Sequence, residues 1–358
     1  PSYVLGGQGM EIAYNDRNIT EFMRIINQVE QEHPILVDKY LMGREVEVDG
    51  VFDGEELLIP GIMEHIERAG VHSGDSISVY PPIHIEDRHK QTILKYTYDL
   101  SKALGVVGLV NIQFVIYDDQ VHVIEVNPRS SRTIPYISKV TGVPIIDLAT
   151  KVMLGQKLRD LGWGYGLYRE ADYFAVKMPV FSFEKLADVD TGLGPEMKST
   201  GEVLGIAESF PQALLKAFKG ANMRAPKKGG RIILTVKDED KGEAVGIARG
   251  FSDLGVEILA TEGTCRTLEK AGVPCTPVAR VSEGHPNIMD MIASGTIDLV
   301  INTPTRGRRQ NTDGFKIRRA AVEHSVGCVT AIDTARALLT ARQQGRSRDL
   351  QAIDITKI

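Results

Sequence analysis

The sequence has little cysteine, few aromatic residues and no long apolar run. Only three of its 358 residues are cysteines, Cys265, Cys275 and Cys328, and their odd number and wide spacing predict reduced thiols rather than a disulfide framework or a zinc site. Aromatic residues make up 6% of the chain and form no stripe with basic residues, so we expect no nucleic-acid binding. No segment approaches the roughly 18 apolar residues of a membrane helix, and the first residues lack the basic and apolar regions of a signal peptide. These absences predict a cytoplasmic protein that binds neither nucleic acid nor membrane.

The remaining composition is that of a folded protein, with 42% hydrophobic and 25% charged residues. A chain of this length is expected to form two domains, each with its own core. It begins with Pro1 rather than Met, on a strand-like segment. We therefore expect it to be the C-terminal part of a longer protein.

The net charge differs in sign between two parts of the chain. Residues 1–222 contain 21 Lys and Arg against 31 Asp and Glu, a net charge of −10, whereas residues 223–358 contain 21 against 16, a net charge of +5. A segment rich in Gly and Lys, residues 220–230, lies between them and predicts a linker. The sequence thus predicts domains 1–222 and 223–358, with different electrostatic requirements for their partners.

In the second part, short apolar strands alternate with helical segments. Strands are expected at residues 231–236, 256–260, 276–281, 297–301 and 327–330, and helices at residues 241–254, 264–271, 288–294, 312–324 and 333–342. Continuous apolar strands separated by helices are typical of a doubly wound parallel sheet, an α/β fold.

The first part has an α+β pattern with an antiparallel component. Extended segments are expected at residues 35–40, 45–52 and 57–64, a helix at residues 88–104, and a strand pair at residues 110–117 and 121–127.

The strand pair carries the most informative polar residues. A two-residue turn at Asp118 and Asp119 would place Gln113 and Glu125 on opposite faces, whereas a three-residue loop, residues 118–120, pairs 113 with 125 and 111 with 127. The longer loop separates the polar side chains Asn111, Gln113, Glu125 and Asn127 from the apolar side chains Ile112, Phe114, Ile116, Ile124 and Val126. We therefore predict the longer loop.

Amide and carboxylate oxygens on one sheet face, followed by two arginines, suit a hard cation that bridges phosphates. Mg²⁺ takes a few protein oxygens and fills its other positions with water and substrate phosphate, while arginines bind the remaining charge. Two further segments fit a nucleotide: a Gly-rich turn at Gly6, Gly7 and Gln8, and a connector at residues 38–41 followed by Glu45. His65, His72 and His84 lack a metal-ligand spacing and are expected to be packed or surface residues.

Two strand ends in the second part predict an anion site. Thr261 and Thr264 follow one strand and open a helix, and Asn302 and Thr303 follow another and run into Arg306, Arg308 and Arg309. Hydroxyls, a helix N-terminus and guanidinium groups at the carboxyl ends of parallel strands suit a phosphorylated ligand.

Together these motifs resemble the carbamoyl phosphate synthase large subunit family. The motifs are Pro-Ser-Tyr-Val-Leu-Gly-Gly at residues 1–7, residues 61–67 with residues 70–76, residues 113–132, and residues 193–197 with residues 199–202. The resemblance covers essentially the whole chain. It implies the second ATP-grasp half, lacking its upstream lobe, followed by a methylglyoxal-synthase-like regulatory domain.

The resemblance implies an ATP-dependent phosphorylation of carbamate to carbamoyl phosphate, in arginine and pyrimidine biosynthesis. It implies that Gln113 and Glu125 bind both of two Mg²⁺ or Mn²⁺ ions and Asn127 one of them. Arg129 and Arg132 would hold phosphate and carbamate, and Glu45 the ribose. The adenine would lie against Asp38, Lys39, Tyr40 and Leu41, and the nucleotide cleft would be lined by Gly70, Val71, His72 and Ser73.

For the second part, the resemblance implies a uridine monophosphate effector bound by Thr261, Thr264, Arg280, Asn302 and Thr303. The implied partners are a glutaminase small subunit and the upstream remainder of the large subunit, in an oligomer. Catalysis by the second part is not expected, because Gly284, His285 and Pro286 stand where the synthase has a catalytic Asp after Gly. Gln8 and Arg280 depart from the Arg and Lys common in relatives, and the piece alone is expected to be inactive.

Two alternatives stay open on the residues alone. Another ATP-grasp ligase, such as a biotin-dependent carboxylase subunit, would share the Gln113, Glu125 and Asn127 set but not the second part. A non-catalytic nucleotide-binding regulatory module would fit the missing lobe.

Overall fold

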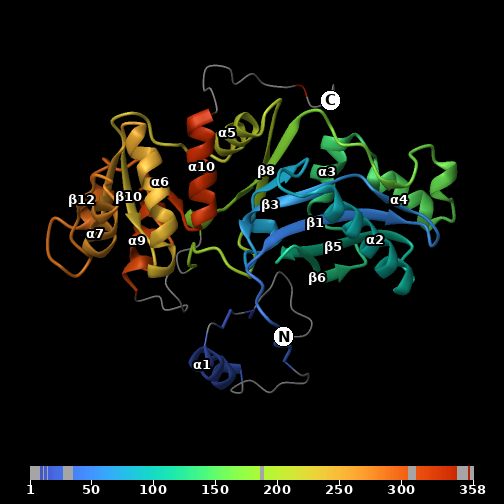
Figure 1. Ribbon diagram of the computed structural model, residues 1–358, viewed down its shortest axis with the longest axis horizontal. Helices are drawn as coiled ribbons and strands as arrows, with labels where there is room; N and C mark the ends of the chain where they lie inside the picture. The colour runs from blue at the N-terminus through green and yellow to red at the C-terminus, as the bar shows by residue number, and fades with distance from the viewer. Residues whose placement is uncertain are drawn as a thin grey trace.

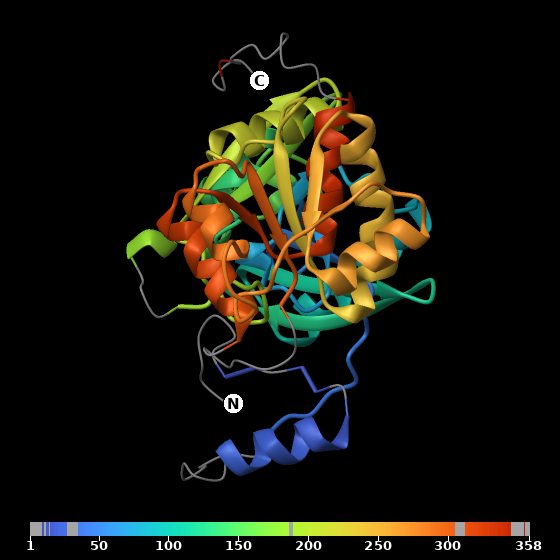
Figure 2. The same cartoon turned by 90° about the vertical axis from the view of Figure 1, so that its left-hand side faces the viewer.

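The computed structural model describes residues 9–10, 12–13, 15–26, 35–185, 189–304, 312–344 and 354. Two sheets lie side by side, and helices α5 and α10 stand between them (Figure 1). The helix α1 (Asp16–Ile26) lies apart from both sheets (Figures 1 and 2).

The first sheet has nine strands in the described part of the chain. They are β1 (Arg44–Phe52), β2 (Leu57–Ile59), β3 (Ile62–Arg68), β4 (Ser78–Tyr80), β5 (Gly108–Tyr117), β6 (Gln120–Asn127), β7 (Gly166–Leu167), β8 (Phe174–Val180) and β9 (Gly201–Ala207). The order is β6-β5-β1-β3-β4-β8-β9, with antiparallel neighbours throughout, and β2 joins β1 to β7 at the side. The antiparallel prediction for this part is confirmed.

Helices cover both faces of this sheet. The helix α2 (Asp87–Ala103) packs on one face, where Ile112 and Phe114 of β5 are buried, and α3 (Ile134–Thr141) and α4 (Ile145–Met153) pack on the other. Because side chains alternate along a strand, Asn111 and Gln113 lie on the face opposite α2. Short 3₁₀ turns lie at Ser73–Asp75, Leu158–Asp160, Phe183–Lys185 and Asp238–Asp240.

Two predicted strands differ from the structure. Residues 35–40 form no strand and are largely exposed. The single strand expected at residues 57–64 is two strands, β2 and β3, because Pro60 and Gly61 lie between them and Pro60 has no N–H to donate to a ladder.

The second sheet confirms the predicted doubly wound parallel sheet. Its strands are β10 (Arg231–Thr235), β11 (Glu257–Ala260), β12 (Thr276–Pro277), β13 (Leu299–Asn302) and β14 (Gly327–Val329), all parallel in the order β12-β11-β10-β13-β14. The helices α6 (Lys241–Asp253), α7 (Glu262–Lys270) and α10 (Ile332–Gln344) contribute to one core, and α8 (Ile288–Ala293) and α9 (Asp313–Glu323) to the other (Figure 2).

The two sheets share an apolar core. The helix α5 (Phe210–Gly220) begins after Ser209 with Pro211 in its first turn, and it buries Leu214 and Phe218 on one face. It packs against β8 and β9 of the first sheet and against α10 of the second. One core cluster accordingly runs from β4, β8 and α5 to β10, α6 and α10. The predicted boundary after residue 222 falls in the short turn that follows α5, and as a domain division it stays a prediction.

Cys265, Cys275 and Cys328 are all free, as expected. Across the described ranges, no helix combines the length and the apolar character needed to cross a membrane.

Candidate functional site

The polar face of the β5–β6 hairpin gathers the predicted metal ligands. Gln113 Nε2 donates to Glu125 Oε1 at 3.0 Å, and Asn127 Nδ2 donates to the same oxygen at 2.8 Å. Asn127 also donates to Asn111 Oδ1 at 3.4 Å, and Gln113 to Ser73 Oγ at 3.3 Å. The structure thus brings Gln113, Glu125 and Asn127 together around one carboxylate oxygen.

The turn that joins β5 to β6 differs from the predicted one. The turn is the two-residue one, because Tyr117 pairs with Gln120, and Asp118 and Asp119 both have positive φ, 48° and 63°. Such a turn matches the twist of a hairpin. The predicted three-residue loop is therefore wrong.

A β-bulge restores the predicted register. The ladder shifts between Gln113 and Phe114, so that Phe114 pairs with Val123 while Gln113 pairs with Glu125. Ile124 is the extra residue and is 45% exposed, so its expected place on the buried apolar face is wrong. The predicted pairs of 113 with 125 and 111 with 127 are confirmed.

The donor set suits a hard cation. One carboxylate and two amide oxygens lie on a face whose neighbouring hydroxyl is Ser73. Within the described residues, no group of three or more His, Cys, Asp or Glu side chains could hold a metal, so a site here depends on the amide oxygens. A softer metal such as zinc, which favours His and Cys, fits this set poorly.

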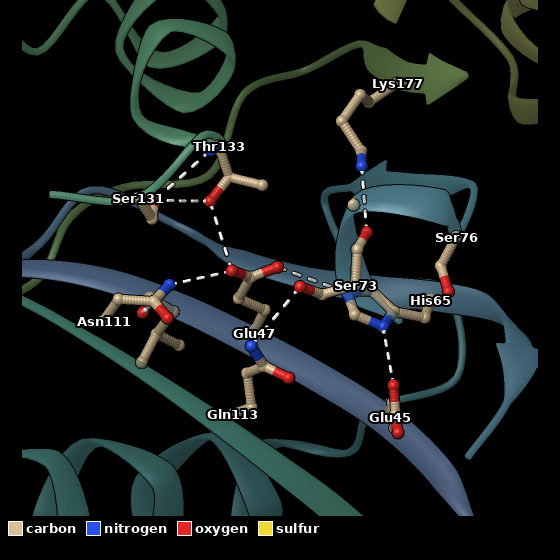
Figure 3. Close-up of polar contacts among 12 residues, drawn as sticks. Glu45, Glu47, His65, Ser73, Ser76, Asn111, Gln113, Ser131, Thr133 and Lys177 are labelled. Carbon is tan, nitrogen blue, oxygen red and sulfur yellow. Dashed lines mark hydrogen bonds and ion pairs between the residues drawn. The ribbon is translucent and has the colours of Figure 1, made fainter. Parts of the chain in front are cut away.

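A buried layer of acids behind this face went unpredicted. Asn111 Nδ2 donates to Glu47 Oε1 of β1 at 2.8 Å (Figure 3). It also donates to Asp49 Oδ1 of the same strand at 2.9 Å. Asp49 also accepts from the hydroxyls of Ser131 and Thr133, each at 2.6 Å. Burial and the charge of Glu47 raise the pKa of Asp49 to about 6. The alternation of Glu45, Glu47 and Asp49 along β1 is the sequence pattern that could have indicated this layer.

His65 on β3 closes the layer between two acids of β1. Its Nδ1 lies 3.1 Å from Glu45 Oε2 and its Nε2 lies 3.4 Å from Glu47 Oε2, with the imidazole almost fully buried (Figure 3). Burial lowers the pKa of His65, but the two carboxylates outweigh it and raise that pKa to about 9. The same imidazolium lowers the pKa of Glu47 against the effect of burial. His65 is thus a packed residue, as predicted, and it holds Glu45.

The predicted nucleotide residues lie around the loop that follows β3. Gly70 N donates to Glu45 Oε1 at 3.4 Å, and Tyr40 Oη donates to Ala69 O at 2.5 Å, so the connector at residues 38–41 meets this loop through Tyr40. Gly70 has a φ of 107°, and a Cβ there would lie 3.0 Å from Tyr40 Oη. Asp38 and Lys39 are exposed, and Leu41 is half-buried. Gly6, Gly7 and Gln8 lie outside the described residues.

Lys177 fixes the end of this loop and was missed by the sequence reasoning. It is 1% exposed on β8, and its Nζ donates to Ser73 O at 3.1 Å (Figure 3). Burial lowers its pKa, although Glu47, Glu202 and Glu67 oppose that shift. His72 N donates to Gly194 O at 2.8 Å, and burial lowers the pKa of His72. A single lysine inside the apolar run of β8 is the signal that could have found it.

The two arginines that were predicted to bind phosphate and carbamate lie in different surroundings. Arg132 Nη1 contacts Met197 Sδ at 3.0 Å and Ser199 Oγ at 3.5 Å. Arg129 Nη1 donates to Ser130 O at 2.8 Å and lines a shallow hollow with Leu104 and Met153. Both arginines are exposed, and no described contact joins them.

Most of the predicted effector residues lie along one edge of the second sheet, at the ends of β11 and β13. Thr235 pairs with Asn302 across β10 and β13, and Asn302 Nδ2 donates to Thr235 Oγ1 at 2.6 Å. Thr303 Oγ1 accepts from Lys237 N at 3.0 Å. Thr261 precedes α7 without a side-chain cap, and Thr264 is buried in its first turn.

Two further cations differ in their position relative to this edge of the sheet: Lys241 lies beside it and Arg280 does not. Lys241 Nζ lies 3.4 Å from the position of a Cβ on Gly263, which places a missed cation beside the start of α7. Arg280 is exposed and its described contacts are with Glu283, so the structure does not bring it to Asn302. Arg306, Arg308 and Arg309 lie outside the described residues.

Comparison with known proteins gives two domain matches. The family model described as "Carbamoyl-phosphate synthase L chain, ATP binding domain" matches residues 1–161, and the model described as "MGS-like domain" matches residues 243–330. With the parallel second sheet, these matches confirm the predicted order of an ATP-binding domain and a methylglyoxal-synthase-like domain. The first match ends at residue 161 and the second begins at residue 243, so neither marks the predicted boundary after residue 222.

Relatives match along the whole chain. The carbamoyl phosphate synthase large chain of Lachnoclostridium phytofermentans is 59% identical over 100% of this chain and 34% of that protein. That of Clostridium perfringens strain 13 is 50% identical over 99% of this chain and 33% of that protein. The chain therefore spans about a third of the length of these relatives. A biotin carboxylase domain of a single-chain bacterial carboxylase is 14% identical, with a TM-score of 0.42, over 56% of this chain and 51% of that one.

Proposed function

Since the chain belongs to the carbamoyl phosphate synthase large-chain family, we propose that its first part transfers the terminal phosphoryl group of ATP to carbamate. The products are carbamoyl phosphate and ADP. The observation that carries this proposal is the convergence of Gln113, Glu125 and Asn127 on one face of the first sheet. The chain that carries them is 50–59% identical to the two large chains of that family described above.

Mg²⁺ or Mn²⁺, as two ions, would be held by Gln113 and Glu125, with Asn127 on one of them, and would neutralise charge on the phosphates. The work of the chain itself is positioning and charge stabilisation, without a covalent protein nucleophile. Asn111 orients Asn127, and Glu47 and Asp49 orient Asn111. Arg132 and Arg129 bind the phosphate and the carbamate.

The nucleotide lies along the loop after β3. Glu45, held by His65, binds the ribose hydroxyls. Residues 38–41 meet the adenine, and Gly70, Val71, His72 and Ser73 line the cleft. The contact of Gln113 with Ser73 Oγ supports this placement, because it joins the cleft to the metal face.

The second part binds a uridine nucleotide, with uridine monophosphate as the effector. Thr261, Thr264, Asn302 and Thr303 form its site at the edge of the sheet, and we assign Arg280 to the same site from the family resemblance. The partners of the whole protein are the remainder of the large chain and a glutaminase small subunit, in a cytoplasmic oligomer that serves arginine and pyrimidine biosynthesis.

Replacement of one carboxylate tests the catalytic proposal. In the full-length large chain, Glu125→Gln keeps the size of the side chain and removes its charge, so carbamate-dependent ATP turnover should fall at least about 100-fold, the scale on which transition-state charge stabilisation acts. The readout is ADP formation from ATP and carbamate.

Gln120→Glu, at the far end of the same strand, is the matched control and should retain turnover. Circular dichroism verifies that both variants fold. A folded Glu125→Gln enzyme with substantial turnover would contradict the assignment.

A further inference from the structure

Asp49 on β1 is the buried end of a row of polar side chains that crosses the first sheet. It pairs with Asn111 of β5, which in turn pairs with Asn127 of β6, so the three side chains lie on one face of neighbouring strands. Asp49 is 0% exposed, whereas Asn127, a proposed metal ligand, is half-buried. The row therefore runs from the interior to the face that would meet substrate.

Asp49 helps to set the direction in which the amide of Asn111 points. Asn111 Nδ2 donates to Asp49 Oδ1 at 2.9 Å. The same nitrogen donates to Glu47 Oε1 at 2.8 Å (Figure 3). Because ionised carboxylates accept hydrogen bonds but do not donate them, the two acids disfavour the flipped amide. Asn111 therefore presents its Oδ1 to Asn127 Nδ2, at 3.4 Å, and holds this metal ligand from the interior.

The same carboxylate binds the connection from β6 to α3, which contains the two arginines of the proposed phosphate site. Ser131 lies between Arg129 and Arg132 in this connection. Its Oγ donates to Asp49 Oδ1 at 2.6 Å. Thr133 Oγ1 donates to Asp49 Oδ2 at 2.6 Å, and Thr133 N donates to Ser131 Oγ at 3.2 Å. Asp49 thus holds the connection at its middle and at its end.

The positions of the two arginines depend on this attachment. Arg129 and Arg132 are both exposed. Arg129 Nη1 donates to the adjacent backbone oxygen of Ser130, and Arg132 Nη1 contacts Ser199 Oγ at 3.5 Å. In the described contacts, neither guanidinium group bonds to β1, β5 or β6. The backbone between the arginines, anchored at Ser131, therefore sets their place relative to the sheet.

We propose that Asp49 is a positioning residue that fixes the spacing between the metal ligands and the phosphate-binding arginines. Its carboxylate accepts from Asn111 on the metal side and from Ser131 and Thr133 on the arginine side. Hydrogen bonds to a charged group are short and strong, so the two sides do not move independently. A phosphoryl group that meets metal and arginine at once requires this fixed spacing. The inference rests on the proposed function.

Two substitutions in the full-length large chain separate the two sides. Asp49→Ala removes the carboxylate that all three donors share. Ser131→Ala removes only the donor between the arginines and leaves the bond from Asn111 in place. One readout is the Kd of Mn²⁺ in the presence of ADP, measured by electron paramagnetic resonance. The other is the KM of carbamoyl phosphate in the reverse reaction, which forms ATP from MgADP.

The two variants should differ in which constant they change. For Asp49→Ala we expect both constants to rise about 10- to 100-fold, the range found for outer-shell partners of metal sites. For Ser131→Ala the KM of carbamoyl phosphate should rise about 10-fold, as for the loss of one hydrogen bond to a charged group, while the Kd of Mn²⁺ stays within about twofold of wild type. In the double variant the KM should equal that of Asp49→Ala alone, because both changes remove the same bond.

Asp53 and Ser138 provide matched controls. Asp53, directly after β1, is also a buried carboxylate, and it accepts from three backbone N–H groups. Ser138 Oγ on α3 donates to Val143 O at 2.6 Å. In the described contacts, neither side chain bonds to the metal face or to the connection from β6 to α3. Asp53→Ala and Ser138→Ala should therefore keep both constants, even where they lower stability.

Each outcome decides a separate question. A wild-type chain that forms no ATP from MgADP and carbamoyl phosphate overturns the proposed function and this inference with it. An active wild type with an Asp49→Ala variant that changes only one constant, or neither, overturns the inference alone, as do equal changes in Asp53→Ala. Circular dichroism verifies folding. If Asp49→Ala does not fold, the double variant Ser131→Ala, Thr133→Val decides, because it releases the arginine side while Asp49 stays, and an unchanged KM of carbamoyl phosphate there contradicts the inference.

Discussion

At the scale of single residues, the site depends on charges that lie behind the face that would meet substrate. His65 is enclosed by Glu45 and Glu47, and Lys177 donates to the backbone of Ser73. Buried charges of this kind are retained only when they are paired and hydrogen-bonded. They hold Glu45 and the loop after β3 in place before any ligand binds.

The pairing of His65 predicts a pH dependence of stability. Its pKa in the folded chain is about 9, above the ordinary value of 6.5, so its stabilisation is complete below pH 6.5 and is lost as the pH rises through 9. The free energy of unfolding should fall by up to about 3 kcal/mol over this window. Urea unfolding of the 358-residue chain at pH 6.5 and at pH 9 measures it.

His65→Gln should remove this part of the pH slope, whereas His122→Gln on β6 should keep it. An identical slope in wild type and His65→Gln would show that the imidazole is neutral in the folded chain.

At the scale of elements, close backbone approach sets where α5 lies on the first sheet. Gly205 on β9 faces this helix directly: a Cβ there would lie 2.2 Å from Ala213 O and 2.6 Å from Ala217 N. The same helix also packs on α10. A glycine on β9 therefore determines the position of the helix that joins the two sheets.

Gly205→Ala should lower the free energy of unfolding by about 1–3 kcal/mol, because backbone atoms of α5 must move to admit the methyl group. Gly201→Ala on the same strand is the control, since among the described residues its Cβ would meet only Val180 Cβ, at 4.0 Å. Denaturant unfolding compares the two variants, and equal stabilities would contradict this account of the packing.

At the scale of the whole molecule, the two parts are joined by a shared core and by charged clusters. The apolar cluster passes from β8 through α5 and α10 to α6. At the end of β3, Arg68 pairs with Asp333 and Glu243, and Arg336 pairs with the same two acids. The parts are therefore expected to unfold together rather than as independent domains.

Arg68→Met should reduce the free energy of unfolding by about 1–2 kcal/mol, because two charge-assisted pairs are lost. The difference from wild type should shrink in 1 M salt, which screens these half-exposed charges. Thermal unfolding at low and high salt provides the measurement. Arg88→Met, whose partners Glu86 and Asp119 lie within the first part, is the control, and an equal effect of both variants would contradict a role in joining the parts.

Local patterns in the sequence determined the class of each part and the identity of the face residues. Strand periodicity placed Asn111, Gln113, Glu125 and Asn127 together, and alternating strands and helices specified the parallel sheet. These features depend on residues that are close together in the chain, so they can be predicted from the order of the residues alone. Local patterns did not determine the hairpin turn. A two-residue turn with a bulge at Ile124 and a three-residue turn both pair Gln113 with Glu125, so the pairing of the polar residues does not distinguish them.

Only the tertiary structure decided which distant charges meet. His65 lies between Glu45 and Glu47, Lys177 reaches Ser73, and Arg318 joins Asp190 to Asn302. These partners are 16 to 128 residues apart and come from different strands, helices and loops. Their pairing follows from burial, because a charge removed from water must find its partner wherever the packing of the core places one.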